Sequence, residues 1–370
     1  MRLLIISASA GAGHARAGSA LAEAARLRFP EATIEHVDVL DFTGRAYKKA
    51  YAGSFLQMVN HAPSLWGYLY EKSDRRKESV VEQKLIRFFD KLEFAPFRRF
   101  VRGFAPDAVL ATHFLPPQVF ASSRRKGRDT FPLGVVVTDF DVHAYWVQPT
   151  ADRIFVASDE LRAMLAPRGV DPSRISVTGI PISQAFVKTY DRAALRQKLG
   201  LTADAPVVLV MGGGAGVGAM EEAVQAVLAG PPVQALAIAG KNAELLESLS
   251  RMKVPAGSKL VPFGFVDTIA ELMAVSDLAV TKSGGLTTSE CLAMGLPMIV
   301  RDPIPGQEER NCDFLLEAGA GVKAHGEASL RFKLKTLVAD REKLARMAAS
   351  ARAAGRPEAA ARIVEWVEKP

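Results

Sequence analysis

Cysteine is scarce in this chain, and long apolar runs are missing from it. Only Cys291 and Cys312 occur among 370 residues, too few for a disulfide framework and typical of a reducing cytoplasm; we assign neither a role. No window of eighteen apolar residues is free of charge, so we expect no transmembrane helix. Internal repeats and low-complexity tracts are also absent. With 49% apolar and 24% charged residues, the sequence predicts a globular protein.

Apolar segments alternate with segments of helical composition, and this alternation predicts a doubly wound parallel sheet. The first series precedes the break at Gly179-Ile180-Pro181, with strands expected at 3–7, 33–39, 108–112, 133–138, 154–157 and 175–178. The pattern then restarts, with strands expected at 207–211, 233–239, 259–262, 278–281 and 297–300. A chain of this length is also too long for one ordinary core, so we predict two α/β domains.

The net charge of +7 is concentrated in one segment. Residues 44–104 hold thirteen Lys and Arg against six Asp and Glu, a net +7, together with twelve aromatic residues. Basic and aromatic residues mixed in this way suit a segment pressed against anionic lipid headgroups. The alternative is a helical lobe with an ordinary core and a solvated basic face. Nucleic acid is not expected as a partner, because no nucleic-acid motif accompanies the charge.

A glycine loop, Ser9-Ala10-Gly11-Ala12-Gly13-His14, follows the first expected strand and opens a helix. Gly11 and Gly13 would let the backbone approach a ligand closely. The dinucleotide fingerprint needs a third glycine where Arg16 stands, which counts against a nicotinamide oxidoreductase. His14 would project from the loop, where a near-neutral imidazole can take a proton from an acceptor hydroxyl. The alternative is a histidine that only caps the helix.

The stretch from Thr281 to Asn311 is the most informative part of the chain. The turn Ser283-Gly284-Gly285 precedes a helix expected to start at Thr287-Thr288-Ser289, and unpaired N–H groups at a helix start hold phosphate well. Glu290, expected in the first turn, could accept two hydrogen bonds from a vicinal diol such as that of ribose.

A second turn, Pro305-Gly306-Gln307-Glu308, follows the next expected strand. Gln307 and Glu308 offer an amide and a carboxylate suited to sugar hydroxyls. The alternatives are a helix-dipole carboxylate at Glu290 and plain turn residues at Gln307 and Glu308. Phosphate, ribose and hexose sites so close together predict a nucleotide-sugar site.

This block resembles the donor-binding signature of glycosyltransferase family 28. Two branches of that family are the monogalactosyl- and processive glucosyl-diacylglycerol synthases and the peptidoglycan N-acetylglucosaminyltransferase. The P-G-Q-E form of residues 305–308, followed by Asn311, resembles the diacylglycerol branch more. The resemblance implies a GT-B fold, in which two Rossmann-like doubly wound domains face a cleft. It also implies an acceptor- and membrane-binding domain at 1–182, a UDP-sugar donor domain at 183–355, and a C-terminal helix in 356–370 that crosses back to the first domain.

The resemblance assigns roles on the acceptor side of the cleft. His14 matches the family's proposed base, with Gly11 and Gly13 beside it. Thr138–Trp146 resembles a Thr-Asp…His…Trp element of the diacylglycerol synthases. It implies that Asp139 supports His14 or holds the acceptor hydroxyl. His143 and Trp146 then contact lipid or headgroup, unless they are structural.

Asp139-x-Asp141 also matches the D-x-D of transferases that bind Mn²⁺ or Mg²⁺ through carboxylates. We discount a metal there, because this spacing is common and the rest of the chain resembles GT-B enzymes.

On the donor side, the second glycine loop at 212–218 resembles the family's loop beneath pyrophosphate and sugar, which makes Gly213 and Gly214 candidates. The family holds its nucleobase at the position of Phe265 and Val266, by backbone contacts and apolar packing. Ser183 departs from the family, whose members commonly place an arginine there, facing the diphosphate.

The resemblance implies an inverting transfer of glucose or galactose from a UDP-sugar to diacylglycerol, without a required metal or cofactor. The expected partners are a UDP-hexose, diacylglycerol and an anionic membrane surface, and the expected location is the cytoplasmic face of the cell membrane, peripherally bound. Four alternatives remain: N-acetylglucosamine transfer to an undecaprenyl-linked acceptor, a nicotinamide oxidoreductase, a non-catalytic nucleotide-sugar sensor, and a UDP-N-acetylglucosamine 2-epimerase. The residues do not distinguish glucose from galactose.

Overall fold

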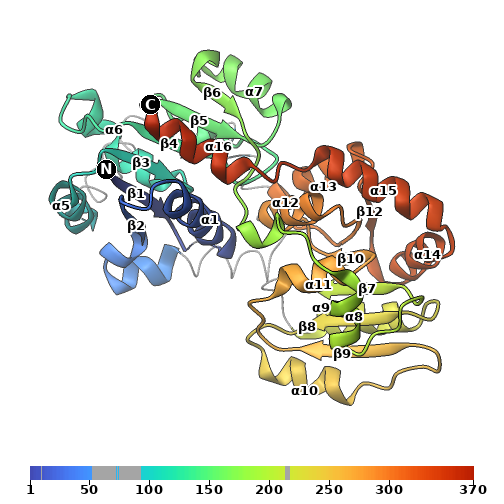
Figure 1. Cartoon of the computed structure of the whole chain (residues 1–370). Helices are drawn as coiled ribbons and strands as arrows, with labels where there is room; N and C mark the ends of the chain where they lie inside the picture. The colour runs from blue at the N-terminus through green and yellow to red at the C-terminus, as the bar shows by residue number, and fades with distance from the viewer. Residues whose placement is uncertain (10, 52–71, 73, 75–92, 213–216) are drawn as a thin grey trace. The chain divides into compact units, whose positions relative to one another are not determined.

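The computed structural model describes two compact units (Figure 1). The described residues are 1–9, 11–51, 72, 74, 93–212 and 217–370. The first unit comprises Met1–Gln184, Pro305–Gln307 and Arg356–Pro370, and the second comprises Ala185–Ile304 and Glu308–Gly355. Gly213 and Gly214, and most of the basic segment 44–104, lie outside the described residues.

The first unit is built on a parallel sheet, with six strands among its described residues in the order β2-β1-β3-β4-β5-β6. The strands are β1 (Arg2–Ser7), β2 (Thr33–Asp38), β3 (Ala108–Ala111), β4 (Leu133–Val136), β5 (Arg153–Val156) and β6 (Ile175–Val177). Leu3–Ile6 of β1 are fully buried, as expected for a central parallel strand covered on both faces. The strands predicted in this half of the chain are therefore confirmed.

Helices cover this sheet on both faces (Figure 1). The helices whose bounds fall within the described part of this unit are α1 (Ala12–Arg28), α5 (Ala95–Phe104), α6 (Leu115–Arg125), α7 (Asp159–Leu165) and α16 (Ala359–Glu365). Short 3₁₀ turns occur at η1 (Val39–Phe42), η2 (Ala144–Trp146), η3 (Ala166–Arg168), η4 (Pro172–Arg174) and η6 (Trp366–Glu368).

The C-terminal helix α16 lies beside α1 in the first unit (Figure 1). Ile363 and Val364 are fully buried in the same cluster as Leu3 and Ile5 of β1. The Arg28 side chain at the end of α1 donates to Glu368 at 2.9 Å. Burial of two branched side chains on an apolar sheet stabilises this arrangement by several kcal/mol, about 1.5–3 for each side chain.

The second unit repeats the architecture, with six strands described in the order β12-β11-β10-β7-β8-β9, all parallel. The strands are β7 (Val207–Met211), β8 (Gln234–Ile238), β9 (Lys259–Phe263), β10 (Leu278–Thr281), β11 (Met298–Arg301) and β12 (Gly321–Ala324). The helices are α8 (Arg192–Lys198), α9 (Val217–Leu228), α10 (Ala243–Arg251), α11 (Ile269–Val275), α12 (Gly285–Met294), α13 (Gln307–Glu317), α14 (Gly326–Ala339) and α15 (Arg341–Ala354), with a 3₁₀ turn η5 (Gln184–Phe186) before them. The predicted strands are confirmed here too, and β12 is an additional one.

Each sheet has a point where the strand order reverses, and ligands of open α/β sheets bind beyond the carboxyl ends of the strands at that point. In the first unit the reversal lies between β1 and β3, which places the loops before α1 and after Ala111 at the expected ligand site. In the second it lies between β7 and β10, which places Gly212 and the start of α12 there. The fold thus predicts one site in each unit.

The described residues include no helix that is both long enough and apolar enough to cross a bilayer.

Candidate active site

His14 is held in one tautomer by the strand-end segment beside it. Its Nδ1 lies 2.9 Å from the backbone carbonyl oxygen of Thr112, and this oxygen can only accept. Nδ1 therefore carries the proton, and the Thr138 hydroxyl lies at 2.9 Å from the same nitrogen. The Thr112 hydroxyl in turn donates to the His14 carbonyl at 2.9 Å. In the neutral ring Nε2 keeps its lone pair, as a general base requires.

The electrostatic surroundings of His14 favour the neutral ring. Desolvation by the residues packed around it lowers the pKa of His14 below the ordinary value of 6.5, whereas the charge of Asp139 and the Thr112 hydrogen bond act in the opposite direction. The side chain keeps partial exposure, so a substrate can reach it. A base that is neutral at pH 7 and lies near a carboxylate can take a proton and be stabilised afterwards.

His143 and Trp146, both predicted to contact the acceptor, are buried in this structure, each at 4% exposure. His143 Nδ1 accepts the Tyr145 N–H at 3.2 Å and caps η2. Asp74 holds the same loop, because it accepts the Ala144 N–H at 2.6 Å. The Trp146 ring centroid lies 6.3 Å from that of His14. The loop is thus built next to His14, and acceptor contacts by the two residues stay a prediction.

Sequence reasoning missed several residues that surround His14. The His113 ring centroid lies 4.6 Å from that of His14 at an interplanar angle of 81°. Phe114 packs against both His113 and Trp146, with centroids at 4.1 and 5.8 Å, and Tyr145 stacks on Phe114 while staying 40% exposed. The available signal was the position of Thr112 and His113 directly after a strand at the switch point.

Gly11 and Gly13 leave space at the start of α1. Apart from its chain neighbours and its own helix backbone, a Cβ built on either glycine would meet no atom of the described residues within 4 Å. Gly11 has φ +146°, a conformation that L residues rarely adopt, whereas Gly13 lies inside the helix. The protein's own packing therefore does not require Gly13, which suits a position that a ligand approaches.

In the second unit, α12 supplies the predicted anion-binding helix start. The helix begins at Gly285, so the prediction of a start at Thr287–Ser289, with Glu290 in the first turn, is wrong. Gly284 is the N-cap and supplies no side-chain hydrogen bond, and a Cβ there would meet nothing within 4 Å. The Thr288 N–H is the first to bond within the helix, to the Gly284 carbonyl at 2.9 Å. The preceding N–H groups, through that of Thr287, suit a phosphate.

Three residues predicted to contact the donor are buried in the second unit. Ser283 and Thr288 are fully buried and Glu290 is 2% exposed. The Ser283 hydroxyl donates to the Glu308 carbonyl at 2.6 Å, whereas the Thr288 hydroxyl is buried and has no hydrogen-bond partner among the described residues. Burial and the neighbouring Glu290 charge raise the pKa of Cys291 far above the range in which a thiol reacts as thiolate. Ribose binding by Glu290 stays a prediction.

Gln307 and Glu308 form the first turn of α13. Glu308 Oε2 accepts the Ile304 N–H at 2.9 Å, which fixes the turn between β11 and α13. Gly306, at φ +94°, provides a conformation that suits glycine. The carboxylate of Glu308 therefore has a structural task, and sugar recognition by this pair stays a prediction.

Phe265 is an exposed aromatic residue at the carboxyl edge of the second sheet. It lies between β9 and α11 and is 63% exposed, with Lys241 Nζ 5.3 Å from its ring centroid. Val266 follows it and is partly exposed. An apolar surface of this kind fits the face of a nucleobase. The two glycines predicted for the same ligand, Gly213 and Gly214, lie outside the described residues.

The Ser183 side chain forms a hydrogen bond within the first unit. Its hydroxyl donates to Glu23 of α1 at 2.8 Å, and the Gln184 N–H donates to the same oxygen at 3.2 Å. Ser183 thus anchors the end of the first unit's main segment. No three His, Cys, Asp or Glu side chains among the described residues are grouped as a metal ion requires.

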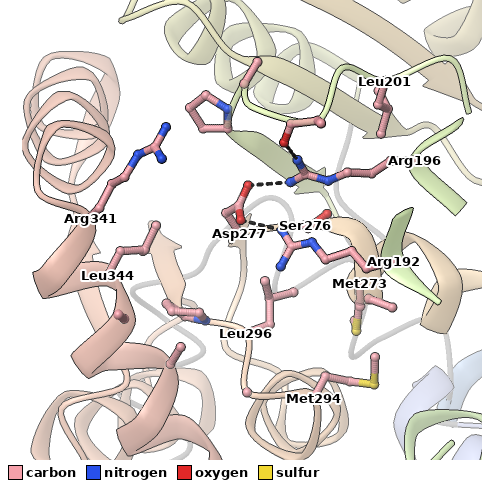
Figure 2. Close-up of a pocket in the computed structure, with 18 of the residues that line it drawn as sticks. Arg192, Arg196, Leu201, Met273, Ser276, Asp277, Met294, Leu296, Arg341 and Leu344 are labelled. Carbon is pink, nitrogen blue, oxygen red and sulfur yellow. Dashed lines mark hydrogen bonds and ion pairs between the residues drawn. The ribbon is translucent and has the colours of Figure 1, made fainter. Parts of the chain in front are cut away.

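A cavity of about 810 Å³ lies in the second unit, at the amino ends of its strands (Figure 2). Its lining includes Pro206, Asp277 and Pro297, which precede β7, β10 and β11, so it opens at the amino ends of the strands. Asp277 accepts hydrogen bonds from both Arg192 and Arg196 and from the Val207 N–H. Met294 and Gly295, at the C-terminal end of α12, also line the cavity, and its ion pairs fasten α8 to the sheet.

The described part of the basic segment includes α5, whose apolar face is turned into the first unit. Phe97, Val101 and Phe104 recur at helical spacing and are buried, whereas Arg99 and Arg102 are exposed. This described part of the segment therefore fits the alternative interpretation, a helix with an ordinary core and a solvated basic face. Six of the twelve aromatic residues that motivated membrane contact lie outside the described residues: Phe55, Trp66, Tyr68, Tyr70, Phe88 and Phe89.

The chain is similar to known proteins over both units. Residues 14–182 match the family described as monogalactosyldiacylglycerol (MGDG) synthase, and residues 207–363 match the glycosyltransferase family 28 C-terminal domain. The processive diacylglycerol beta-glucosyltransferase of Bacillus subtilis (strain 168) is 29% identical over 350 residues, which cover 94% of this chain and 89% of that protein.

Solved structures share the fold. Acinetobacter baumannii MurG superposes with a TM-score of 0.66 at 17% identity, over 100% of this chain and 99% of that one. The UDP-GlcNAc 2-epimerase of Neisseria meningitidis, bound to UDP-GlcNAc, gives a TM-score of 0.62 at 15% identity over 100% of both chains. These likenesses confirm the predicted GT-B fold. Because the two family matches follow one another along the chain and the Bacillus relative spans most of it, the chain belongs to glycosyltransferase family 28, in the branch of the monogalactosyl- and processive glucosyl-diacylglycerol synthases.

Proposed function

We propose that this protein is an inverting glycosyltransferase that moves glucose or galactose from a UDP-sugar to the free hydroxyl of diacylglycerol. The observation that carries the proposal is the fixed tautomer of His14, whose Nδ1–H faces the Thr112 carbonyl at 2.9 Å and leaves Nε2 as a base. The names of the relatives, processive diacylglycerol beta-glucosyltransferases, support diacylglycerol as the acceptor.

In the proposed reaction, Nε2 of His14 takes the proton of the lipid hydroxyl while its oxygen attacks the anomeric carbon. The bond from that carbon to the UDP oxygen breaks in the same displacement, so the anomeric configuration inverts. Asp139 stabilises the imidazolium that forms, because its negative charge favours the protonated ring. UDP departs as an anion, and the N–H groups at the start of α12, which begins at Gly285, stabilise its phosphates.

The two units divide these tasks in the proposal. Residues 1–182 bind the acceptor and the membrane, and residues 183–355 bind the UDP-sugar. Segment 44–104, with its net charge of +7, holds the protein on anionic headgroups at the cytoplasmic face of the cell membrane. Phe265 and Val266 hold uracil, and Gln307 and Glu308 read the hexose. The reaction as proposed needs no metal and no cofactor.

The test is an assay of the purified protein with diacylglycerol in anionic liposomes. UDP-glucose, UDP-galactose and UDP-N-acetylglucosamine are supplied separately, and the extracted lipids are weighed by mass spectrometry. We expect a hexosyl-diacylglycerol from one of the first two donors and none from His14→Ala. His36→Gln is the matched control: His36 lies in the same unit, its Nε2 is 2.9 Å from the Ser7 hydroxyl, and glutamine can reproduce that bond. Tight UDP binding without any glycolipid would refute the diacylglycerol acceptor and direct the search to undecaprenyl-linked acceptors or a sensor.

A further inference from the structure

A second histidine, His113, lies against the proposed base and has no part in the reaction described above. It is 2% exposed, and its ring meets that of His14 nearly at a right angle, with centroids 4.6 Å apart. It directly follows Thr112, whose carbonyl fixes the His14 tautomer. Two consecutive residues after β3 therefore contact the same imidazole, one through its backbone and one through its ring.

The tautomer of His113 is fixed as well. Its Nδ1 accepts the backbone N–H of Leu115 at 3.0 Å, so this nitrogen carries no proton and the ring proton is on Nε2. Leu115 is the first residue of α6, whose N-cap Phe114 provides no side-chain bond. Pro116 and Pro117 follow and have no N–H. The Leu115 N–H thus depends on His113, and protonation of Nδ1 would break that bond.

His113 consequently stays neutral across the working pH range. Burial lowers the pKa of His113 well below the ordinary histidine value, and the charge that His14 can acquire lowers it further. Asp139 and His113 are two titratable groups that interact electrostatically with His14. The Tyr51 ring also lies near His113, with the two ring centroids 6.3 Å apart.

We propose that His113 is a positioning residue for His14: its neutral ring packs against the base, excludes water from it, and holds its Nδ1–H on the Thr112 carbonyl. Since Nε2 then keeps its lone pair, His113 sets both the orientation and the proton affinity of the base. The inference rests on the proposed role of His14, although the ring contact itself can be tested without any lipid substrate.

Two substitutions distinguish the effect of the His113 ring from the effect of its hydrogen bond. In His113→Asn the amide oxygen can accept the Leu115 N–H, but the ring is lost and water reaches His14. In His113→Phe a ring still covers His14, but the Leu115 N–H loses its acceptor. A histidine that only capped α6 would tolerate Asn and suffer from Phe. If His113 positions His14, the His14 titration should instead change in His113→Asn and stay unchanged in His113→Phe.

The first measurement is nitrogen-15 NMR of the six histidine rings in the wild-type protein between pH 5 and 8. We expect Nδ1–H on neutral His14, and Nε2–H on His113 with no titration in this range. A His113 ring that titrates in this range, or a His14 ring protonated on Nε2 when neutral, would overturn the proposal before any variant is made.

The second measurement repeats the titration on the variants. We expect His113→Asn to raise the midpoint of His14 by about half a pH unit or more, because water relieves the desolvation of the imidazolium. The acid limb of kcat/KM should move up with it, and kcat should fall by about tenfold or more from loss of orientation. His113→Phe should leave the midpoint low while lowering the thermal midpoint. The unchanged His36 resonances report that the fold is intact.

An unshifted His14 midpoint in folded His113→Asn would overturn the proposal. If instead the NMR shifts occur as expected but wild-type protein forms no glycolipid, the positioning contact stands and the proposed reaction fails.

Discussion

The Ser283 hydroxyl donates to the backbone carbonyl of Glu308 across 2.6 Å, and this bond joins two loops that are separate in the sequence. Ser283 precedes α12, whose first N–H groups have no acceptor within an α-helix and are the proposed phosphate site. Glu308 is in the first turn of α13, the proposed hexose site. Ser283 is fully buried, so its side chain does not reach solvent. We therefore expect Ser283 to act on donor binding by setting the distance between the two loops.

Ser283→Ala should weaken donor binding without removing any group that touches the donor. The Glu308 carbonyl loses the hydrogen bond from Ser283, which costs about 1 kcal/mol of folding free energy. For a domain of this size we expect the thermal midpoint to fall by about 2–4 °C. UDP affinity, measured by calorimetry, should fall several-fold as the loops separate. Ser289→Ala is the control, since that hydroxyl bonds within α12 itself, to the Gly285 carbonyl at 2.9 Å. Equal losses of UDP affinity in both variants would contradict this account.

The lowered pKa of His14 predicts how activity and stability depend on pH. Below the ordinary histidine value of 6.5 the unfolded chain binds a proton that folded His14 still resists, so the unfolded state binds more protons and stability falls with falling pH. The same protonation removes the base, so kcat/KM should be flat near pH 7 and decline only below 6.5. Denaturant melts between pH 5 and 7.5 on wild type and His14→Ala check the first statement. A wild-type profile of kcat/KM whose acid limb lies above pH 6.5 would contradict the second.

Asp139→Asn should move the acid limb of the rate profile to lower pH. Its charge raises the pKa of His14 against the larger effect of desolvation, so its removal leaves desolvation less opposed. The imidazolium formed in the reaction also loses a stabilising charge, and we expect kcat to fall by about 10²-fold. Asp141→Asn is matched in chemistry and lies two residues away, outside the interactions that shift His14. An effect of equal size at Asp141 would show that the loop, not the Asp139 charge, is responsible.

Sequence patterns predicted the strands well, because a buried parallel strand is an apolar run between turn residues. They did not reveal β12, whose four residues Gly321–Ala324 include Lys323 and which lies at the edge of its sheet. A four-residue edge strand has too few apolar residues to be distinguished from a loop by its sequence. The start of α12 was placed two residues late, because Gly284 and Gly285 resemble a turn although Gly285 adopts helical geometry.

The candidate site could be located from sequence but not resolved into contacts. Glycine loops and strand ends indicate where a ligand binds, because switch-point geometry fixes those positions. Whether a polar side chain there faces a ligand or a neighbouring loop depends on tertiary packing. Ser283 bonds to Glu308, and His143 caps its own turn, while His113 lies against His14 without any motif to mark it.

A substitution at Phe265 in the second unit can change UDP binding with little effect on stability. Its ring is 63% exposed, so Phe265→Ala removes little buried surface and should leave the thermal midpoint within about 1 °C. If the ring packs on uracil, the loss of about 1 kcal/mol of aromatic contact should weaken UDP binding about fivefold. Phe332→Ala is the matched control, because Phe332 on α14 is 69% exposed and lies away from the proposed nucleotide residues in the sequence. Calorimetric titration with UDP, and with UDP-glucose, measures both variants. Wild-type affinity in Phe265→Ala would remove this residue from the nucleobase site and leave Val266 and the backbone of that loop as the remaining candidates.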